Sequence, residues 1–255
     1  INRNYDEAAL IIVEGNVLEA EARFDQAGFL SKVELGRPLI AFKSAASLDG
    51  RIATKSGHSQ WITGLEARKR GHMLRAEYDA IIVGIGTALA DDPRLNCRVA
   101  GLSEASPLRI VIDSKLHLNP ATDLAKRARD QPTWVFTTEA APADQRSKLE
   151  ALGVRIIIGT TGQNGRVDAK SVARKLGDEG VTRALIEGGG ALAASFLKAD
   201  LIDRVHSFRA GIIIGGDGRA AIGPLGLDRV DGAPSYMAHS TRQVGEDIEQ
   251  LFVRQ

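Results

Sequence analysis

The sequence predicts an α/β fold with three layers, in which a mostly parallel central sheet ends in antiparallel C-terminal strands. Short runs of β-branched residues alternate along the chain with longer stretches of helical periodicity, as expected of strand–helix–strand units. The short runs are almost continuously apolar, which is typical of strands covered on both faces. With 44% hydrophobic and 25% charged residues over 255 positions, the chain is long enough and apolar enough to bury a sizeable core.

Each expected element follows from its own stretch of sequence. Short apolar runs predict strands at 38–42, 80–84, 109–113, 134–138, 154–158 and 183–187. Helical periodicity predicts helices over 64–77, 142–152, 168–179 and 190–200, the last with an apolar stripe through Leu192, Phe196 and Leu197. After about residue 203, the segments RVHSFRAGIII and SYMAHSTRQVGEDIEQLFVR predict strands joined by glycine-rich turns, which would finish the sheet in antiparallel pairing.

Charge and cysteine content narrow the class of protein. The formal net charge is +1, so no overall field attracts nucleic acid or a membrane surface. No apolar run approaches the roughly 18 residues that a membrane span needs, and no signal peptide opens the chain. The one cysteine, Cys97, rules out an internal disulfide framework; it fits a reducing compartment and the packing of a small buried side chain. We therefore expect a cytoplasmic protein without nucleic-acid or membrane partners.

The strongest local signal is the stretch RALIEGGGALAASFL at 183–197, a strand and three glycines followed by a helix. Glycines allow close approach of a ligand, and the free N–H groups at a helix start favour anions such as a pyrophosphate. A tight strand-to-helix turn without any ligand is the plainer alternative. Glu187 directly precedes the glycines, at the strand end where open α/β sheets bind their ligands.

Other predicted strands also run into polar ends. The stretch VGIGTALADDPRLNCR at 83–98 leads from a strand into a glycine-rich turn with Thr87, Asp91 and Arg98, although Asp91-Asp92-Pro93 could equally cap or end a turn. The strand VIDSKL at 111–116 ends in Asp113, Ser114 and Lys115. Polar ends on several parallel strands converge at one sheet edge, which favours a shared ligand site.

The segment KSAASLDGRIATKSGHSQWITG at 43–64 adds another group of polar side chains. Lys43 either extends to water or reaches an anionic ligand or reacting oxygen. Trp61 is either a core residue or a flat apolar wall for a ring. Arg75, on the helix that follows, is either a solvated surface residue or a phosphate ligand, because its forked donors fit a phosphate group.

Several other chemistries have little support. The five histidines are scattered, with no pair at metal-ligand spacing beside a Cys or carboxylate partner, so no metal site is predicted. The chain has neither a G-x-S-x-G elbow nor a Walker lysine loop. The residues alone therefore indicate an α/β enzyme-like domain that binds a phosphorylated ligand, most plausibly a nucleotide.

Taken together, the motifs SLDGRIA, SQWIT, ADDP and EGGG, in this order and spacing, resemble the reductase domain of bacterial RibD riboflavin-biosynthesis proteins from about Arg37 to the C-terminus. The resemblance implies a dihydrofolate-reductase-like fold and NADPH-dependent reduction of 5-amino-6-(5-phosphoribosylamino)uracil to the ribitylamino compound. Homo-oligomers, such as dimers, are common among such proteins. The same fold also carries reductases of other pterin or pyrimidine substrates, and a non-catalytic nucleotide-binding remnant is a further alternative.

The resemblance also implies roles for individual positions. Implied substrate contacts are Ser59, Arg75, Leu95, Arg98 and Glu187, with the two arginines at the ribose phosphate. Implied cofactor contacts are Ala45, Trp61, Thr87, Asp91, Ser114, Gly189, Gly190, Ala191, Leu192, Ala193, Ala194 and Ser195. We add Lys115 as a candidate beside Ser114 for the adenosine 2′-phosphate. Lys43 and Asp91 are the catalytic candidates for supplying or stabilising a proton while hydride reaches C1′ of the opened sugar, and bound water could share this task.

The N-terminal region and one loop depart from the family pattern. Full-length relatives carry an upstream zinc deaminase domain with an H-x-E…P-C-x-x-C signature. Nothing in this chain matches that signature, so residues 1–36 are expected to be the tail and connector of such a domain, followed by a reductase domain at 37–255. The chain begins with Ile1 rather than Met, which suggests a fragment. Gly211 replaces the proline of many relatives, which leaves the geometry of its loop open.

Overall fold

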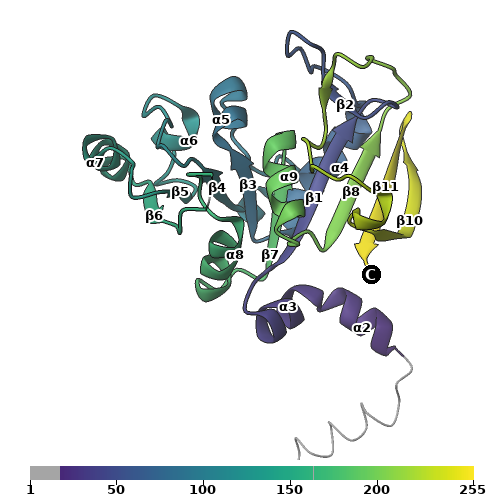
Figure 1. Cartoon of the computed structure of the whole chain (residues 1–255), viewed down its shortest axis with the longest axis horizontal. Coiled ribbons are helices and arrows are strands. Elements are labelled where there is room, and N and C mark those ends of the chain that lie inside the picture. The colour runs from purple at the N-terminus through teal and green to yellow at the C-terminus, as the bar shows by residue number, and fades with distance from the viewer. Residues whose placement is uncertain (1–17, 163) are drawn as a thin grey trace, which may run out of the picture.

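The structure is a computed structural model that describes residues 18–162 and 164–255. These residues form a nine-stranded sheet in the order β10-β11-β8-β1-β7-β3-β4-β5-β6 and a separate two-stranded sheet of β2 and β9 (Figure 1). The strands are β1 (Leu39–Ala46), β2 (Arg51–Ala53), β3 (Ala80–Gly84), β4 (Leu108–Ile112), β5 (Thr133–Thr137), β6 (Arg155–Ile158), β7 (Arg183–Glu187), β8 (Arg204–Arg209), β9 (Arg219–Ala220), β10 (Tyr236–Val244) and β11 (Asp247–Arg254).

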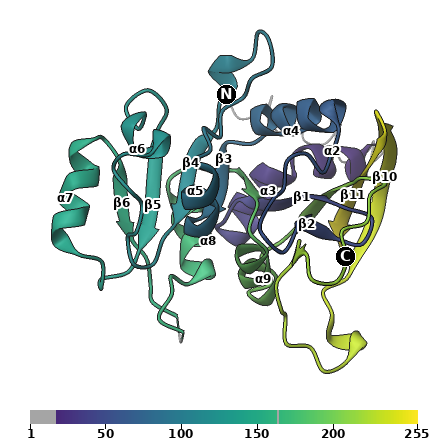
Figure 2. The same ribbon diagram turned by 90° about the horizontal axis from the view of Figure 1, so that it is seen from above.

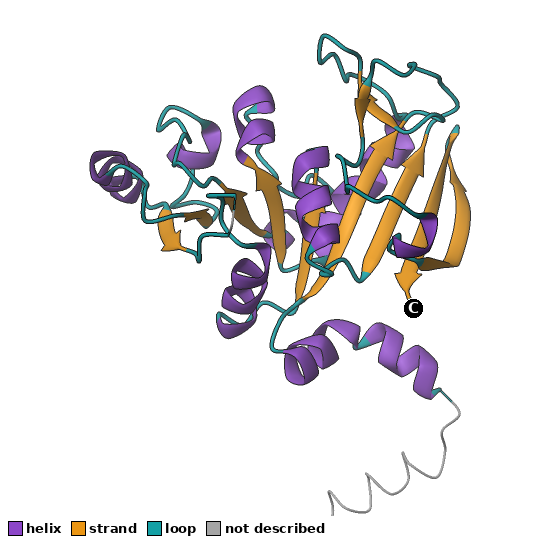
Figure 3. Ribbon diagram, in the orientation of Figure 1, coloured by secondary structure: helices purple, strands orange, loops and turns teal. Residues whose placement is uncertain are grey.

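Helices cover both faces of the large sheet and complete the three layers (Figure 3). They are α2 (Glu19–Asp25), α3 (Ala27–Leu35), α4 (Leu65–Glu77), α5 (Ile85–Asp91), α6 (Asp123–Lys126), α7 (Ala143–Ala151), α8 (Ala169–Asp178) and α9 (Gly190–Lys198), with 3-10 turns η1 (Ser103–Ala105) and η2 (Val230–Gly232). Viewed from above, α4 and α9 lie on opposite sides of β1 (Figure 2). In the described part of the chain, no helix has the length and apolar character needed to cross a membrane.

Alternate residues of each strand face different helices, which explains the nearly continuous apolar runs. Ile40, Phe42 and Ile186 pack with α8 and α9 in one buried cluster. Their neighbours Ala41 and Leu185 face α4 in another cluster, while β3 to β5 meet α5, α6 and α7 in a third. The predicted three-layer α/β fold is confirmed, and so are the six predicted strands and four predicted helices, apart from their ends.

Three local predictions need correction. The first strand continues beyond residue 42 to Ala46, so Lys43 and Ala45 lie within β1 rather than after it. Residues 85–91, expected as part of a glycine-rich turn, form α5. Residues 18–36, expected as one short helical stretch and a connector, form α2 and α3, while residues 1–17 lie outside the described residues.

The C-terminal strands pair as predicted, but the reversal comes later than expected. Strand β8 is parallel to β1, and antiparallel pairing begins between β8 and β11 and continues between β11 and β10. Gly211 lies in the exposed loop after β8, where a Cβ would meet nothing within 4 Å. A larger residue therefore fits this position, and the departure from proline needs no rearrangement of the core.

Helices α2 and α3 lie against the beginnings of β7 and β8, at the edge of the sheet that is opposite the strand ends considered below (Figure 1). The ring of Phe24 stacks on His239 at a centroid distance of 4.2 Å, and the Arg204 guanidinium lies 3.9 Å from the Phe24 ring centroid. Arg183 and Arg204 donate to the carbonyl groups of Asp25 and Phe24. These contacts join the N-terminal helices to the main sheet.

Gly177 in α8 allows a stability test of the close packing between α8 and the backbone of Gly36 and Arg37. A Cβ at Gly177 would lie 2.4 Å from the Gly36 carbonyl oxygen and 2.9 Å from Arg37 Cα, both backbone atoms. We expect Gly177→Ala to lower the free energy of unfolding by about 2 kcal/mol, since overpacking of a well-packed site costs roughly 1–3 kcal/mol. Urea unfolding measures this change. The matched control is Gly86→Ala in α5, where nothing lies within 4 Å of the added Cβ and a small gain is expected. Equal stability of the two variants would contradict the close contact.

Candidate active site

The candidate site begins where β1 and β7 lie side by side at the centre of the sheet. Lys43 of β1 is paired in register with Glu187, the last residue of β7. The Lys43 ammonium lies 4.0 Å from Glu187 Oε2, and both side chains face α4. The two groups come from segments far apart in sequence, and the parallel pairing of β1 with β7 sets their separation.

Arg75 of α4 holds the Glu187 carboxylate from the other side. Its Nε and Nη2 each donate to one carboxylate oxygen at 2.9 Å. Burial of Glu187 opposes ionisation, but the charges of Arg75 and Lys43 outweigh it and lower the pKa of this carboxyl to about 2. Glu187 is therefore a fixed carboxylate at neutral pH. Arg75, predicted as a phosphate anchor, uses most of its donors within the protein.

A third donor of Arg75 extends the site to the loop after α5. Arg75 Nη1 donates to the Asn96 carbonyl at 3.1 Å, and His72 Nδ1 lies 3.2 Å from the same oxygen. Burial and the charges of Arg75 and Arg98 lower the pKa of His72. Neither His72 nor Asn96 was predicted from the sequence, because no local pattern shows that a helix side chain meets a backbone carbonyl 24 residues later.

The glycine turn after Glu187 lies at the same edge of the sheet. Gly188 and Gly189 have φ values of 80° and 74°, which favour glycine. Gly190 is needed for a different reason, since a Cβ there would lie 2.7 Å from the Ala220 carbonyl oxygen. Thr87 at the start of α5 packs on this turn, with Oγ1 3.3 Å from the position of a Cβ on Gly189.

The start of α9 has the properties of an anion site. By helix geometry the N–H groups of Gly190 and Ala191 have no acceptor within the helix. The side chains of Leu192, Ala193 and Ala194 are buried against the sheet, whereas Ala191 and Ser195 are exposed. A ligand at this helix end can therefore contact backbone donors of the turn, but not those three buried side chains, whereas Ser195 lies more than one helical turn further along α9.

The two aspartates at the end of α5, Asp91 and Asp92, differ in their surroundings. The Asp92 carboxylate accepts the Asp123 N–H at the start of α6, so this residue has the capping role that the sequence allowed. Asp91 is exposed and lies one helical turn beyond Thr87. Among the described residues its carboxylate has no hydrogen-bond or ion-pair partner. Asp91 remains free to meet a ligand at the same edge of the sheet as Lys43 and Gly189.

The remaining predicted residues surround this centre. Trp61 is 67% exposed and carries the Arg68 guanidinium at 4.4 Å from its ring, so it is not a core residue. Ser59 is exposed, and Ala45 is half-buried on β1. The prediction that Leu95 contacts the substrate needs correction. Its side chain is buried in a core cluster, so only its backbone can contact a ligand.

Ser114 lies just beyond the end of β4, which is two strands from β7 and Glu187. Its hydroxyl accepts the Val167 N–H at 3.0 Å, and its carbonyl accepts from Thr138. The hydroxyl hydrogen remains able to donate to a ligand. Lys115 beside it is exposed. The order of β7, β3 and β4 in the sheet places the glycine turn, α5 and Ser114 along one line of strand ends.

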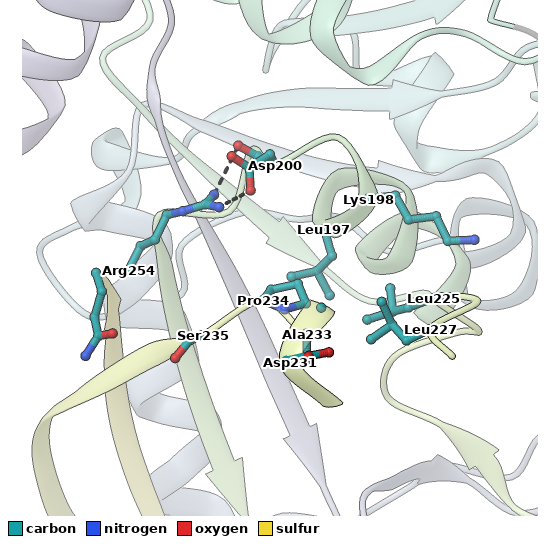
Figure 4. Close-up of a pocket in the computed structure, with 12 residues that line it drawn as sticks. Leu197, Lys198, Asp200, Leu225, Leu227, Asp231, Ala233, Pro234, Ser235 and Arg254 are labelled. Carbon is teal, nitrogen blue, oxygen red and sulfur yellow. Dashed lines mark hydrogen bonds and ion pairs between the residues drawn. The ribbon is translucent and has the colours of Figure 1, made fainter. Parts of the chain in front are cut away.

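A pocket of about 550 Å³ lies elsewhere, at the opposite end of α9 from the glycine turn (Figure 4). Leu197, Leu225 and Pro234 line it, and Arg254 pairs with Asp200 beside it. No predicted site residue borders this pocket. Within the described part of the chain, no group of three or more His, Cys, Asp or Glu side chains is arranged to hold a metal ion.

Comparison with known proteins places the chain in a family. The family model described as RibD C-terminal domain matches residues 38–249. The chain belongs to the RibD C-terminal domain family. This match contains every predicted site residue from Lys43 to Ser195, and it leaves α2 and α3 outside.

Relatives of this RibD C-terminal domain differ in length. The riboflavin biosynthesis protein RibD of Actinobacillus pleuropneumoniae is 36% identical over 246 residues, and the chain spans 63% of its length. The 2,5-diamino-6-ribosylamino-4(3H)-pyrimidinone 5′-phosphate reductase of Methanothermobacter thermautotrophicus is also 36% identical, over 214 residues that make up 83% of this chain and 96% of that protein. The structure of Acinetobacter baumannii RibD superposes with a TM-score of 0.79 at 28% identity, covering 90% of this chain and 62% of that one.

Proposed function

We propose that this chain reduces 5-amino-6-(5-phosphoribosylamino)uracil to the corresponding ribitylamino compound, with NADPH as the hydride donor. The observation that carries the proposal is the meeting of three features at one sheet edge. A fixed carboxylate, Glu187, lies between Lys43 and Arg75, and a glycine turn with free N–H donors follows it immediately. The family membership supports a nicotinamide cofactor and a phosphorylated pyrimidine substrate.

The residues present fit such a cofactor. The turn at Gly188–Gly190 would take the pyrophosphate, because its backbone donors and the α9 terminus favour an anion. Thr87, Asp91, Ala45 and Trp61 would border the nicotinamide half, and Ser114 with Lys115 would meet the adenosine 2′-phosphate. When bound, NADPH supplies the hydride.

The protein's own task is to orient the sugar and to manage one proton. The ribosylamine opens to a C1′=N imine as its nitrogen gives up a proton and its ring oxygen gains one; hydride addition at C1′ and one further proton at nitrogen then give the amine. Lys43 can donate to a sugar oxygen or polarise it, while Glu187 can accept from sugar hydroxyls or base N–H groups. Asp91 is the second candidate for the proton. Alignment of the reacting groups accounts for several kcal/mol in favourable cases.

Arg98 is the principal candidate for the substrate phosphate. It is exposed, and in the described part of the chain no carboxylate pairs with it. Arg75 supports the phosphate only with the donors that Glu187 and Asn96 leave free. The charge of Arg98 also helps to lower the pKa of His72, the neighbour of Arg75 on the same face of α4.

Arg98→Ala tests this assignment. We expect the KM for the phosphorylated substrate to rise about tenfold to a hundredfold, since a hydrogen bond to a charged group contributes roughly 1.5–3 kcal/mol. The KM for NADPH should stay the same. The dephosphorylated riboside should react equally well with both proteins. Arg174→Ala, at an exposed position on α8, is the matched control. An unchanged KM for the phosphorylated compound would remove Arg98 from the phosphate site.

The proposed activity itself is tested by NADPH oxidation that depends on the pyrimidine. The Methanothermobacter relative is named for a 2,5-diamino-pyrimidinone substrate, which makes reduction of that compound the second candidate function. Both compounds should therefore be assayed side by side, with NADH as the alternative donor. NADPH binding without oxidation in the presence of either compound would favour a non-catalytic nucleotide-binding remnant, and turnover of another pterin alone would favour a different reductase.

We also propose that the protein acts as a homodimer. Strand β10 lies at the free edge of the sheet and is exposed along most of its length. Met237 on this strand is 58% exposed. An uncovered sheet edge can pair with another chain. Sedimentation equilibrium of the purified chain distinguishes a dimer from a monomer.

A further inference from the structure

Two side chains on α4 hold one backbone carbonyl of the loop at residues 92–98, here called the substrate loop. His72 and Arg75 are three residues apart and share a helix face, and both approach the Asn96 carbonyl oxygen, at 3.2 and 3.1 Å. A carbonyl oxygen only accepts hydrogen bonds, so His72 Nδ1 carries the hydrogen. The two donors fill both lone pairs of this oxygen.

The substrate loop needs such support. Leu95 adopts a φ of 54°, a region that branched side chains avoid. On the other side of Asn96, the Cys97 N–H donates to Ser106 Oγ at 3.1 Å and the Cys97 side chain is buried. Arg98 follows directly. The side chains of α4 therefore bind the loop at the Asn96 carbonyl, which lies between Leu95, the residue with positive φ, and the exposed Arg98.

His72 and Arg75 differ in the other contacts that they make. Arg75 is already fixed by its paired bonds to Glu187, so its substitution would disturb the carboxylate as well as the loop. Among the described residues, the His72 ring makes one hydrogen bond, to the Asn96 carbonyl. His72 can therefore be changed with less direct effect on Glu187, which makes it the better probe of the loop.

We propose that His72 is a positioning residue, which fixes the substrate loop through the Asn96 carbonyl and so holds Arg98 toward the substrate phosphate. The second half of this statement rests on the proposed function, whereas the first half concerns the protein without ligand. The two halves are tested by separate measurements.

Cys97 gives a direct measure of loop opening, because it is the one cysteine of the chain and it is 1% exposed. His72→Leu removes the donor, and His72→Asn places an amide N–H₂ near the position of Nδ1. We expect Ellman's reagent to label Cys97 of native His72→Leu about three- to tenfold faster than in the wild type, because the loss of one hydrogen bond favours opening of the loop by about this factor. His72→Asn should label at nearly the wild-type rate.

Controls separate local opening from global unfolding. Lys69→Leu changes an exposed residue of the same helix that pairs with Glu66, and it should leave the labelling rate unchanged. Urea unfolding of each variant gives the contribution of the fully unfolded state to labelling. Equal labelling of His72→Leu and wild type, or equally fast labelling of the Leu and Asn variants, would overturn the loop-fixing role.

Kinetics test the second half. His72→Leu should raise the KM for the phosphoribosyl substrate about three- to tenfold, with kcat and the KM for NADPH nearly unchanged, and His72→Asn should restore the KM. Faster labelling with an unchanged KM would refute the effect on substrate binding and leave the proposed function standing. Absence of any turnover by the wild type would refute the proposed function, while the labelling result would still decide the loop-fixing role.

Discussion

Replacing Lys43 by methionine is expected to lower kcat/KM for the phosphoribosylamino substrate by about a hundredfold to ten-thousandfold, the usual contribution of a group that assists proton transfer. The ammonium is the one cationic side chain that β1 presents beside Glu187, and it lies 4.0 Å from that carboxylate. Methionine keeps the length and packing of the side chain but cannot donate. NADPH oxidation at saturating cofactor measures the change.

Lys69→Met is the matched control for this prediction. The same substitution there removes an exposed lysine of α4 that pairs with Glu66, and its kcat/KM should match the wild type. NADPH affinity of Lys43→Met, measured by quenching of protein fluorescence, should remain within about twofold of wild type if Lys43 acts on the sugar. A kcat/KM for Lys43→Met close to that of the control would show that Asp91 or water supplies the proton without Lys43.

Glu187→Gln is expected to lower kcat/KM at least about a hundredfold and to destabilise the fold by about 3 kcal/mol at neutral pH. The amide cannot balance Arg75 and Lys43, whose side chains are only 16% and 20% exposed. Removal of one partner from a buried ion pair typically costs about 3–5 kcal/mol. Urea unfolding and NADPH oxidation provide the two measurements.

The stability difference should depend on pH in a defined direction. The pKa of Glu187 is lowered from 4.5 to about 2 in the folded protein, so its ionised form stabilises the fold above about pH 4.5. This contribution is lost as the pH falls toward 2, and the wild type should then approach Glu187→Gln in stability. A difference that stays constant between pH 7 and pH 3 would contradict the ion-pair origin of the effect.

A double variant separates charge balance from catalysis. Combining Glu187→Gln with Arg75→Gln removes both members of the pair, so the unfolding free energy should recover in part relative to the single variant. Activity should not recover, because the carboxylate that we propose as a substrate contact is still missing. Recovery of turnover in the double variant would reduce Glu187 to a counterion for Arg75.

The fold was predictable where burial repeats locally along the chain. The runs at 80–83 and 184–186 are apolar at every position because helices cover both faces of the sheet. The second half of β1 was missed, since KSAA is polar and small; these residues form a strand because β8 pairs with all four of them, and β7 also pairs with Lys43. Helix α5 was missed because Gly86 and its short length weaken the local helical signal.

The parts of the site that lie in one short sequence motif were predictable. The glycines after Glu187 indicated a close backbone approach, and two of them have the positive φ that such a turn uses. The pairing of Arg75 with Glu187 spans 112 residues, and no local pattern gives it. The same reason hides His72, whose role depends on how α4 packs over the loop, and Leu95, whose side chain lies in the core cluster with residues of β3 and α5.

The order of strands also determines when the site can form as the chain emerges from the ribosome. Strand β1 is made first, but its two neighbours, β7 and β8, begin only at Arg183 and Arg204. Strands β3 to β6 can pair among themselves meanwhile, because they are adjacent both in sequence and in the sheet. A chain that ends before Glu187 therefore contains Lys43 but lacks the carboxylate that pairs with it in the candidate site.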